Sequence, residues 1–167
     1  MTRRGFVHKL ALGAGVALFS NFIPSVARAT NKPECMVLSC LDFRVMDDVA
    51  NLMWGRKLHN KYDHIVLAGA SLAVLNDAAP AWGTTFWDHL ALSVAEHGIK
   101  KVIVIDHRDC AAYKAVLGPN HLKTRQTETE AHTMMMTRLR DFIKARYGTM
   151  EVELLLMGVD GKTDKIG

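Results

Sequence analysis

The sequence predicts an α/β protein in which a mostly parallel, doubly wound sheet is flanked by helices. Short apolar runs bounded by turn residues alternate along the chain with segments whose apolar residues recur at helical spacing. This alternation favours parallel strands, because each crossover helix returns the chain to the same edge of the sheet. The 167 residues are 49% hydrophobic and 23% charged, which is typical of a globular domain with an apolar core.

The first predicted unit is a strand, a tight loop and a helix. The apolar run over 34–39 is short and bounded by Pro33 and the loop at Asp42, as in a buried strand. Apolar residues then recur at helical spacing over 45–53, with acidic residues on the other face. A second strand is expected over 64–68, and it leads into the small-residue loop Gly69-Ala70-Ser71.

The central part of the chain predicts a helix over 80–97, which Gly98 is well placed to end. The segment 101–106 (KVIVID) is the clearest buried strand in the sequence. A further helix is expected to begin near Asp109 or Cys110 and to end before the Gly-Pro pair at 118–119.

The longest helix is expected over 127–147, with Thr127 and Glu130 as a capping box. Its predicted inward-facing residues are Met135, Leu139, Phe142 and Ile143. A last strand is expected over 151–157, followed by a turn at Asp160-Gly161.

Residues 1–29 have the pattern of an export signal, which leaves 30–167 as a single domain. Arg3-Arg4 precedes an apolar run over 10–19, and Ala27-Arg28-Ala29 forms an A-x-A cleavage site. The arginine pair followed by Phe6 resembles the twin-arginine signal, which predicts a periplasmic protein exported in the folded state. The alternative is a membrane anchor, but the apolar run is shorter than the roughly 18 residues that a membrane span needs.

The net charge of +4 comes from the predicted signal. Four of the 21 Lys and Arg residues precede residue 30, and the remaining 17 balance the 17 Asp and Glu residues. No basic cluster interleaved with aromatic residues remains, so the sequence does not favour nucleic-acid binding. After signal cleavage we expect no association with a membrane.

Three cysteines follow the predicted signal, and an odd number leaves at least one thiol unpaired or bound to metal. Cys35 lies an odd number of residues before Cys40, hence on the opposite face of the strand, and is expected to be a buried apolar thiol. For Cys40 and Cys110, a disulfide is an alternative that an oxidising periplasm would favour.

Two motifs stand where predicted parallel strands end: Cys40-x-Asp42-x-Arg44 and His107-x-x-Cys110. Sites in open α/β sheets form beyond the carboxyl ends of the strands, where the strand order reverses, so the motifs meet if their strands are neighbours. Two thiolates and one imidazole suit zinc and leave its fourth position open. We expect the helix N-terminus to lower the pKa of Cys110.

The acidic residues of the motifs have alternative interpretations. Asp42 can reach either the metal or Arg44, or the two can form a surface ion pair. Asp109 is interpreted as a residue that favours the start of the following helix.

The two motifs resemble the zinc motifs of β-class carbonic anhydrases. Residues 86–115 are similar to that family's helix, strand and H-x-x-C segment, and 154–163 to its last strand and turn. The resemblance implies that Cys40, His107 and Cys110 bind one zinc per protomer. It implies that Asp42, paired with Arg44, orients a zinc-bound water whose hydroxide hydrates CO2 to bicarbonate. In the family's closed form, this aspartate takes the fourth zinc position.

The resemblance also implies a homodimer or higher homo-oligomer with the site at the subunit interface. Aromatic residues in excess of what the core needs are expected to suit that interface: Phe43, Trp54, Trp82, Phe86 and Trp87.

The sequence departs from the family pattern in its length and at three places beside the motifs. The loop over 67–71 replaces an R-N-A-G-N pattern, Arg108 replaces a small residue, and Ala111 replaces a glycine. The chain is also shorter than most members. We expect Arg108 and the altered loop to lie beside the metal, where they could redirect activity to COS or CS2, or leave a zinc-binding scaffold. A periplasmic thiol redox protein using Cys40 and Cys110 is a further alternative.

Overall fold

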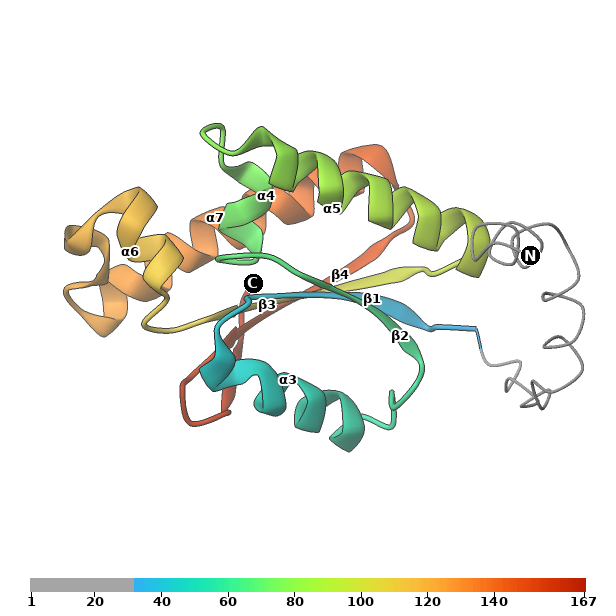
Figure 1. Ribbon diagram of the computed structural model, residues 1–167, viewed down its shortest axis with the longest axis horizontal. Coiled ribbons are helices and arrows are strands. Elements are labelled where there is room, and N and C mark those ends of the chain that lie inside the picture. Colours follow the sequence, from blue (N-terminus) through green and yellow to red (C-terminus); the bar gives the residue numbers. More distant parts are fainter. Residues whose placement is uncertain (1–31) are drawn as a thin grey trace, which may run out of the picture. The chain divides into compact units, whose positions relative to one another are not determined.

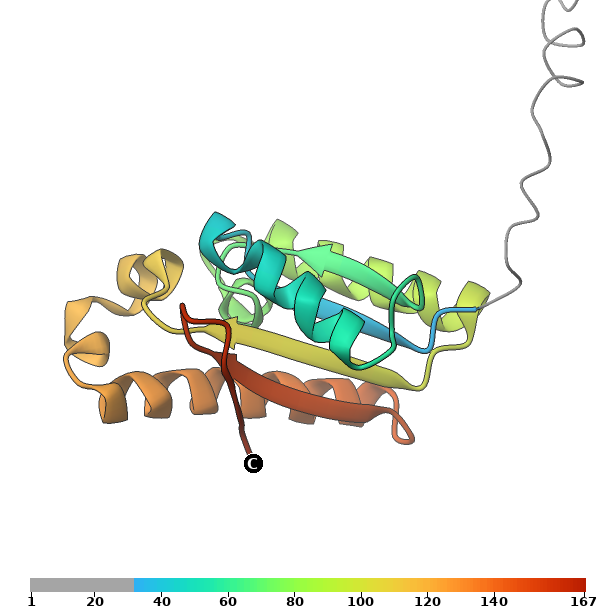
Figure 2. The same ribbon diagram turned by 90° about the horizontal axis from the view of Figure 1, so that it is seen from below.

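Five strands form one sheet in the order β2-β1-β3-β4-β5 (Figure 2). Their bounds are β1 (Cys35–Ser39), β2 (Tyr62–Val66), β3 (Lys101–His107), β4 (Glu151–Met157) and β5 (Thr163–Lys165). The first four strands are mutually parallel, and β5 pairs antiparallel with β4. The mostly parallel sheet predicted from the alternating pattern is therefore confirmed.

The computed structural model describes residues 32–167, which form one compact unit. The export signal predicted over 1–29 lies outside the described residues and stays a prediction. Within 32–167, no helix combines the length and the apolar character that a membrane crossing needs.

Helices cover both faces of the sheet (Figure 1). One face carries α3 (Phe43–Gly55), and the other carries α4 (Ser71–Leu75), α5 (Pro80–Leu92) and α7 (Arg125–Arg146). The short helix α6 (Ala111–Leu117) lies beyond the end of β3 (Figure 1). Two single turns, η1 (Ser93–His97) and η2 (Pro119–Leu122), follow α5 and α6.

The alternation of side chains along β1 separates two apolar cores. Met36 and Leu38 pack in the core that also holds α5 and α7 residues, whereas Cys35 and Val37 pack beneath α3. Cys35 is 1% exposed, and burial raises its pKa to about 11, so the predicted buried thiol is confirmed.

Several element boundaries differ from those predicted. Strand β2 spans Tyr62–Val66 instead of 64–68, and the helix over 80–97 is α5 followed by the π-helical turn η1. Gly98 ends that turn with a φ of 71°, as predicted. The short elements α4, η2 and β5 were not predicted, because three to five residues carry too little periodicity to detect.

The capping box of the longest helix lies one turn earlier than predicted. Thr124 caps α7 by accepting a hydrogen bond from the backbone N–H of Thr127, whose own side chain reaches back to the cap. Leu139 and Ile143 are buried as predicted, and Met135 is partly buried. The inward orientation predicted for Phe142 is wrong, because its side chain is largely exposed and lies under the guanidinium of Arg138.

The strand order reverses at β1, which lies between β2 and β3. The chain passes from β1 to β2 on one side and then crosses to β3 on the other, so the two crossings open a crevice at the carboxyl ends. Because Ser39 pairs with Ile105, the residues that follow β1 emerge beside the end of β3. The two motifs predicted to meet therefore do so.

Candidate metal centre

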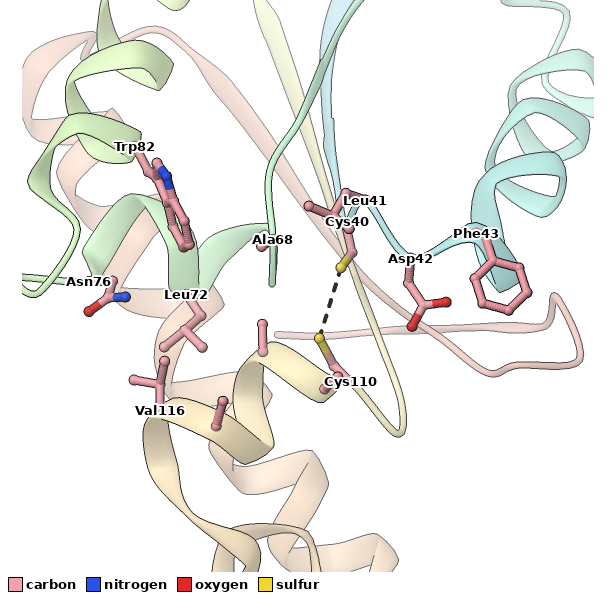
Figure 3. Close-up of a pocket in the computed structure, with 13 residues that line it drawn as sticks. Cys40, Leu41, Asp42, Phe43, Ala68, Leu72, Asn76, Trp82, Cys110 and Val116 are labelled. Atoms are coloured by element: carbon pink, nitrogen blue, oxygen red, sulfur yellow. Dashed lines mark hydrogen bonds between the residues drawn. The ribbon is translucent and has the colours of Figure 1, made fainter.

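Cys40, His107 and Cys110 gather at the end of β1 and β3, and all three are buried. Cys40 directly follows β1, His107 is the last residue of β3, and Cys110 is the N-cap of α6. Their ligand atoms lie within 4.8 Å of one another, and the two Sγ atoms are 3.9 Å apart (Figure 3). The described cysteines are all free, so the disulfide alternative is not seen.

The imidazole of His107 presents one unpartnered nitrogen. Its Nδ1 lies 2.9 Å from the carbonyl oxygen of Arg108, which places the proton on Nδ1 because a carbonyl only accepts. Its Nε2 is buried and has no hydrogen-bond partner. A buried nitrogen lone pair without a partner is costly, and a metal ion would satisfy it.

These donors fit zinc. Two sulfurs bonded to tetrahedral zinc at about 2.3 Å lie about 3.8 Å apart, and the observed separation of the Cys40 and Cys110 sulfurs is 3.9 Å. Two soft sulfurs with one imidazole are a donor set of catalytic zinc sites. The fold thus brings together the residues predicted to bind the metal.

The two thiols interact strongly with one another. The hydrogen bond with Cys110 lowers the pKa of Cys40, and the backbone N–H of Gly69 lowers it further. The neighbouring Cys40 thiolate, together with burial, raises the pKa of Cys110. Backbone N–H groups at the start of α6, those of Ala112 and Tyr113, lower the pKa of Cys110 as predicted, but Cys40 and burial outweigh them.

The loop after β2 supplies a backbone donor to the site. Gly69 and Ala70 have φ values of 87° and 45°, and this left-handed path brings the Gly69 N–H 3.2 Å from the Cys40 sulfur. A Cβ at Gly69 would lie 3.1 Å from the Cβ of Ala112 on α6, so the loop also packs tightly against α6. The loop that departs from the family pattern is thus part of the site.

Asp42 and Arg44 form a bidentate ion pair at the start of α3. Arg44 donates from Nε to Oδ1 at 3.0 Å and from Nη2 to Oδ2 at 2.8 Å, and Asp42 also caps α3 through the Arg44 N–H. The Asp42 side chain is 13% exposed and that of Arg44 is 34% exposed, so the pair lies at the surface with its carboxylate turned inward beside the cluster. The Arg44 hydrogen bonds lower the pKa of Asp42 to about 2. Its Oδ2 lies 3.9 Å from Nε2 of His107.

Asp109 and Arg108 have roles other than those expected. Asp109 accepts a 2.8 Å hydrogen bond from Arg44, and its φ of 55° is not that of a helix start, where Cys110 is the cap. Arg108 turns away from the pocket and donates to the three side chains Glu128, Thr129 and Asp164. The expectation that the Arg108 side chain lies beside the metal is wrong, because acceptors on α7 and β5 hold its guanidinium away from the cluster.

A cavity of about 560 Å³ opens beside the two sulfurs (Figure 3). Asp42 borders it at the sulfur end, and Asn76 and Trp82 lie on the opposite wall. The rest of the lining is mainly apolar, with Leu41, Phe43, Ala68, Leu72, Ala111, Ala112, Ala115 and Val116. Such a cavity suits a small apolar molecule that approaches a polar centre.

Several site residues were not singled out from the sequence. Leu72 lies on the unpredicted α4 and Asn76 directly follows it. Gly69 was expected beside the metal only as part of the altered loop, and its backbone hydrogen bond to Cys40 was not foreseen. Trp82 lies on the predicted α5 and was singled out for a subunit interface instead of the cavity wall. The one available signal was the Gly69-Ala70 pair directly after a strand, which is typical of a backbone that must approach another group.

Comparison with known families matches residues 30–166 to the family described as "Putative carbonic anhydrase". Two relatives, uncharacterized proteins of Rickettsia conorii and Rickettsia bellii, are each 37% identical to this chain over 139 residues. The matches cover 83% of this chain, 75% of the Rickettsia conorii protein and 85% of the Rickettsia bellii protein.

Solved carbonic anhydrases share the fold. The enzyme from Glaciozyma antarctica has a TM-score of 0.55 at 16% identity, covering 95% of this chain and 99% of that one. The enzyme from Streptococcus mutans has a TM-score of 0.56 at 15% identity, covering 100% and 99%. A tetrameric β-carbonic anhydrase from Sordaria macrospora has a TM-score of 0.53 at 13% identity, covering 99% and 98%. At these identities the likeness establishes the α/β fold.

The Gly69 backbone donor can be tested with a matched pair of glycine variants. Gly69→Ala and Gly98→Ala both place a Cβ at positive φ, at a cost of about 1–2 kcal/mol each. Only Gly69→Ala also meets Ala112 and displaces the N–H from Cys40. We expect zinc affinity to fall about tenfold in Gly69→Ala and to stay unchanged in Gly98→Ala, measured by chelator competition. Equal zinc affinities would contradict the role of the loop.

Proposed function

The chain belongs to the family described as "Putative carbonic anhydrase", and from this premise we propose that it is a zinc enzyme that interconverts CO2 and bicarbonate. One zinc per protomer would be held by Cys40, His107 and Cys110. The observation that carries the proposal is the buried, unpartnered Nε2 of His107, which faces two sulfurs at zinc-like separation beside an apolar cavity.

The residues around the cluster suit CO2 hydration. Zinc, when bound, would supply the Lewis acidity that makes water nucleophilic near neutral pH. Asp42 remains ionised because Arg44 holds its pKa at about 2, so its carboxylate accepts a hydrogen bond and does not retain the proton. It would thereby orient the lone pair of the attacking water toward the cavity.

The cavity would hold the substrate next to this water. CO2 is linear, small and without net dipole, so the mainly apolar wall near Leu72 and Val116 binds it without demanding hydrogen bonds. Attack by the water oxygen on the carbon forms the new C–O bond, and loss of one water proton to solvent leaves bicarbonate. The apolar lining also matches COS and CS2, which makes these two molecules the alternatives to test beside CO2.

A homo-oligomer would bury the rim of this cavity. Phe43 is 84% exposed on one side of the cavity mouth, and Leu41 near it and Trp82 and Val116 on the other side are also exposed (Figure 3). Exposed apolar clusters of this kind mark interaction surfaces. Of the aromatic residues expected at an interface, Phe43, Trp54 and Trp82 are exposed, whereas Phe86 is in the core. We propose a homodimer or higher homo-oligomer that forms through this rim, as the tetrameric relative from Sordaria macrospora also assembles from copies of itself.

Zinc content and CO2 hydration test the function directly. We expect about one zinc per protomer in the wild type, and loss of the metal in Cys40→Ser, His107→Ala and Cys110→Ser. Asp42→Asn should keep zinc and lose at least about tenfold in the hydration rate, since it cannot orient the water in the same way. Stopped-flow kinetics with a pH indicator measure the rate.

The outcomes separate the alternatives. A folded, zinc-loaded protein with no hydration above buffer would exclude the carbonic anhydrase. Turnover of COS or CS2 by the same sample would then support the altered activity. No turnover of either molecule would support the zinc-binding scaffold. A wild type without zinc whose Cys40 and Cys110 form a disulfide would favour the thiol redox alternative.

The oligomer is tested by charge substitution on one helix. Phe43→Glu at the cavity rim should shift the protein toward monomer in light scattering after size exclusion, because a buried carboxylate opposes association. Trp54→Glu is the control, since Trp54 is also exposed on α3 but lies three turns away from the rim. Dissociation by the control alone would place the interface elsewhere.

Export rests on the sequence alone, and we propose that residues 1–29 direct the folded protein to the periplasm through the twin-arginine route. Replacing Arg3 and Arg4 together by Lys should retain the protein in the cytoplasm, as followed by fractionation and immunoblotting. Arg28→Lys keeps the charge outside the pair and should be exported normally. Periplasmic accumulation of the double variant would contradict this route.

A further inference from the structure

A buried polar network centred on Asp106 adjoins the candidate metal centre and has no part in the chemistry proposed above. The Asp106 carboxylate is 1% exposed and accepts four hydrogen bonds, from three side chains and one backbone N–H. Ser71, Tyr113 and His132, which supply them, are themselves fully buried. A buried carboxylate is costly unless it is hydrogen bonded, so its donors form a unit that is held in one arrangement.

The first connection runs from Asp106 to the loop that contacts Cys40. Ser71 donates its N–H to Oδ1 at 3.0 Å and its hydroxyl to Oδ2 at 2.7 Å. Ser71 follows directly on Gly69 and Ala70, whose positive φ values aim the Gly69 N–H at the Cys40 sulfur. Asp106 therefore anchors the end of the strained loop that supplies a hydrogen bond to one predicted metal ligand.

The second connection runs from Asp106 to the helix that carries Cys110. Tyr113 lies three residues after Cys110 on α6, and its hydroxyl donates to Oδ2 of Asp106 at 2.5 Å. Its ring also packs on His132 of α7, with a centroid distance of 3.8 Å, and His132 Nδ1 lies 3.0 Å from the same Oδ2. The position of α6, and with it that of the Cys110 sulfur, is thus tied to the same carboxylate.

The third connection is covalent, because Asp106 directly precedes His107 on β3. Successive residues of a strand face opposite sides, so Asp106 does not compete with His107 for the metal. One carboxylate is therefore linked to all three predicted ligands: through the loop to Cys40, through the backbone to His107 and through α6 to Cys110.

We propose that Asp106 is a positioning residue for the metal centre. Its hydrogen bonds with Ser71 and Tyr113 set the separation of the Cys40 and Cys110 sulfurs. This inference rests on the proposed function, in that the cluster must bind zinc. Ligands held close to their bound geometry before the metal arrives lose less conformational freedom on binding, which raises affinity. If the network served folding alone, its loss would lower stability and leave zinc affinity unchanged.

Deleting the hydroxyls of Ser71 and Tyr113 tests their hydrogen bonds to Asp106 without removing the carboxylate. Ser71→Ala and Tyr113→Phe each delete one donor to Oδ2, and Ser71→Ala keeps its backbone N–H. We expect each variant to bind zinc about tenfold more weakly in chelator competition, and to shift the sulfur-to-cobalt charge-transfer bands of the Co(II)-loaded protein. The double variant should lose less than the product of the two factors, because both hydroxyls act through one oxygen atom.

Ser93→Ala is the matched control. Ser93 is also buried, and its hydroxyl also bonds a carboxylate, that of Asp63. Asp63 pairs with Met36 near the opposite end of the sheet from Cys40. We expect Ser93→Ala to lose stability in urea unfolding of the metal-free protein while it keeps wild-type zinc affinity and cobalt bands.

The outcomes distinguish the two proposals. No zinc binding by the wild type would overturn the proposed function. Zinc binding by the wild type with unchanged affinity and bands in Ser71→Ala and Tyr113→Phe would overturn the positioning role alone. An equal loss in Ser93→Ala would also overturn it, because the effect would then belong to any deleted buried hydroxyl. If Tyr113→Phe does not fold, Ser71→Ala decides the question.

Discussion

The parallel register between β1 and β3 is the constraint on which the candidate site depends. Ser39 pairs with Ile105, so Cys40 leaves β1 beside the last residues of β3, which end at His107. A slip of one residue would turn every side chain of β1 to the other face, placing Cys35 and Val37 where Met36 and Leu38 now pack. Because each face has its own buried core, such a slip is strongly disfavoured, and the register that builds the cores also brings the ligands together.

Around this constraint, polar and apolar groups are divided between two sides of the cluster. The Asp42 carboxylate, Arg44 and Asp109 form a charged group at one side, where Arg44 bridges two separate loops. The other side is the apolar cavity wall near Leu72 and Val116. The two side-chain hydrogen bonds from Arg44 explain why the pKa of the Asp42 carboxyl is low although it is near the surface. The same wall offers few competing hydrogen bonds to a substrate.

The sequence singled out the candidate ligands, which the fold brings together, because their signals are local and chemical. Cysteine and histidine directly after apolar strands are rare enough to single out Cys40, His107 and Cys110, and the strand alternation predicts that their strand ends share one edge. The interpretations of Asp109 and Arg108 are wrong because their hydrogen-bond partners lie far along the chain, on α3 and α7. The H-x-x-C motif itself gives no indication of those partners. The pKa of Cys110 was misjudged for a related reason, since a thiolate 3.9 Å away outweighs a short helix.

Asp106 shows what a pattern of residue types cannot predict. It shares a face of β3 with Val102 and Val104, which are fully buried in the larger core, so a carboxylate there is the least favourable choice for packing alone. From the sequence alone, Asp106 is simply the polar residue at the end of an apolar strand. Only the fold brings Ser71, Tyr113 and His132 to it from three different helices. A carboxylate can gather donors from several elements at one point, which no apolar side chain can do. That capacity is the reason to connect this buried carboxylate with the neighbouring candidate metal centre.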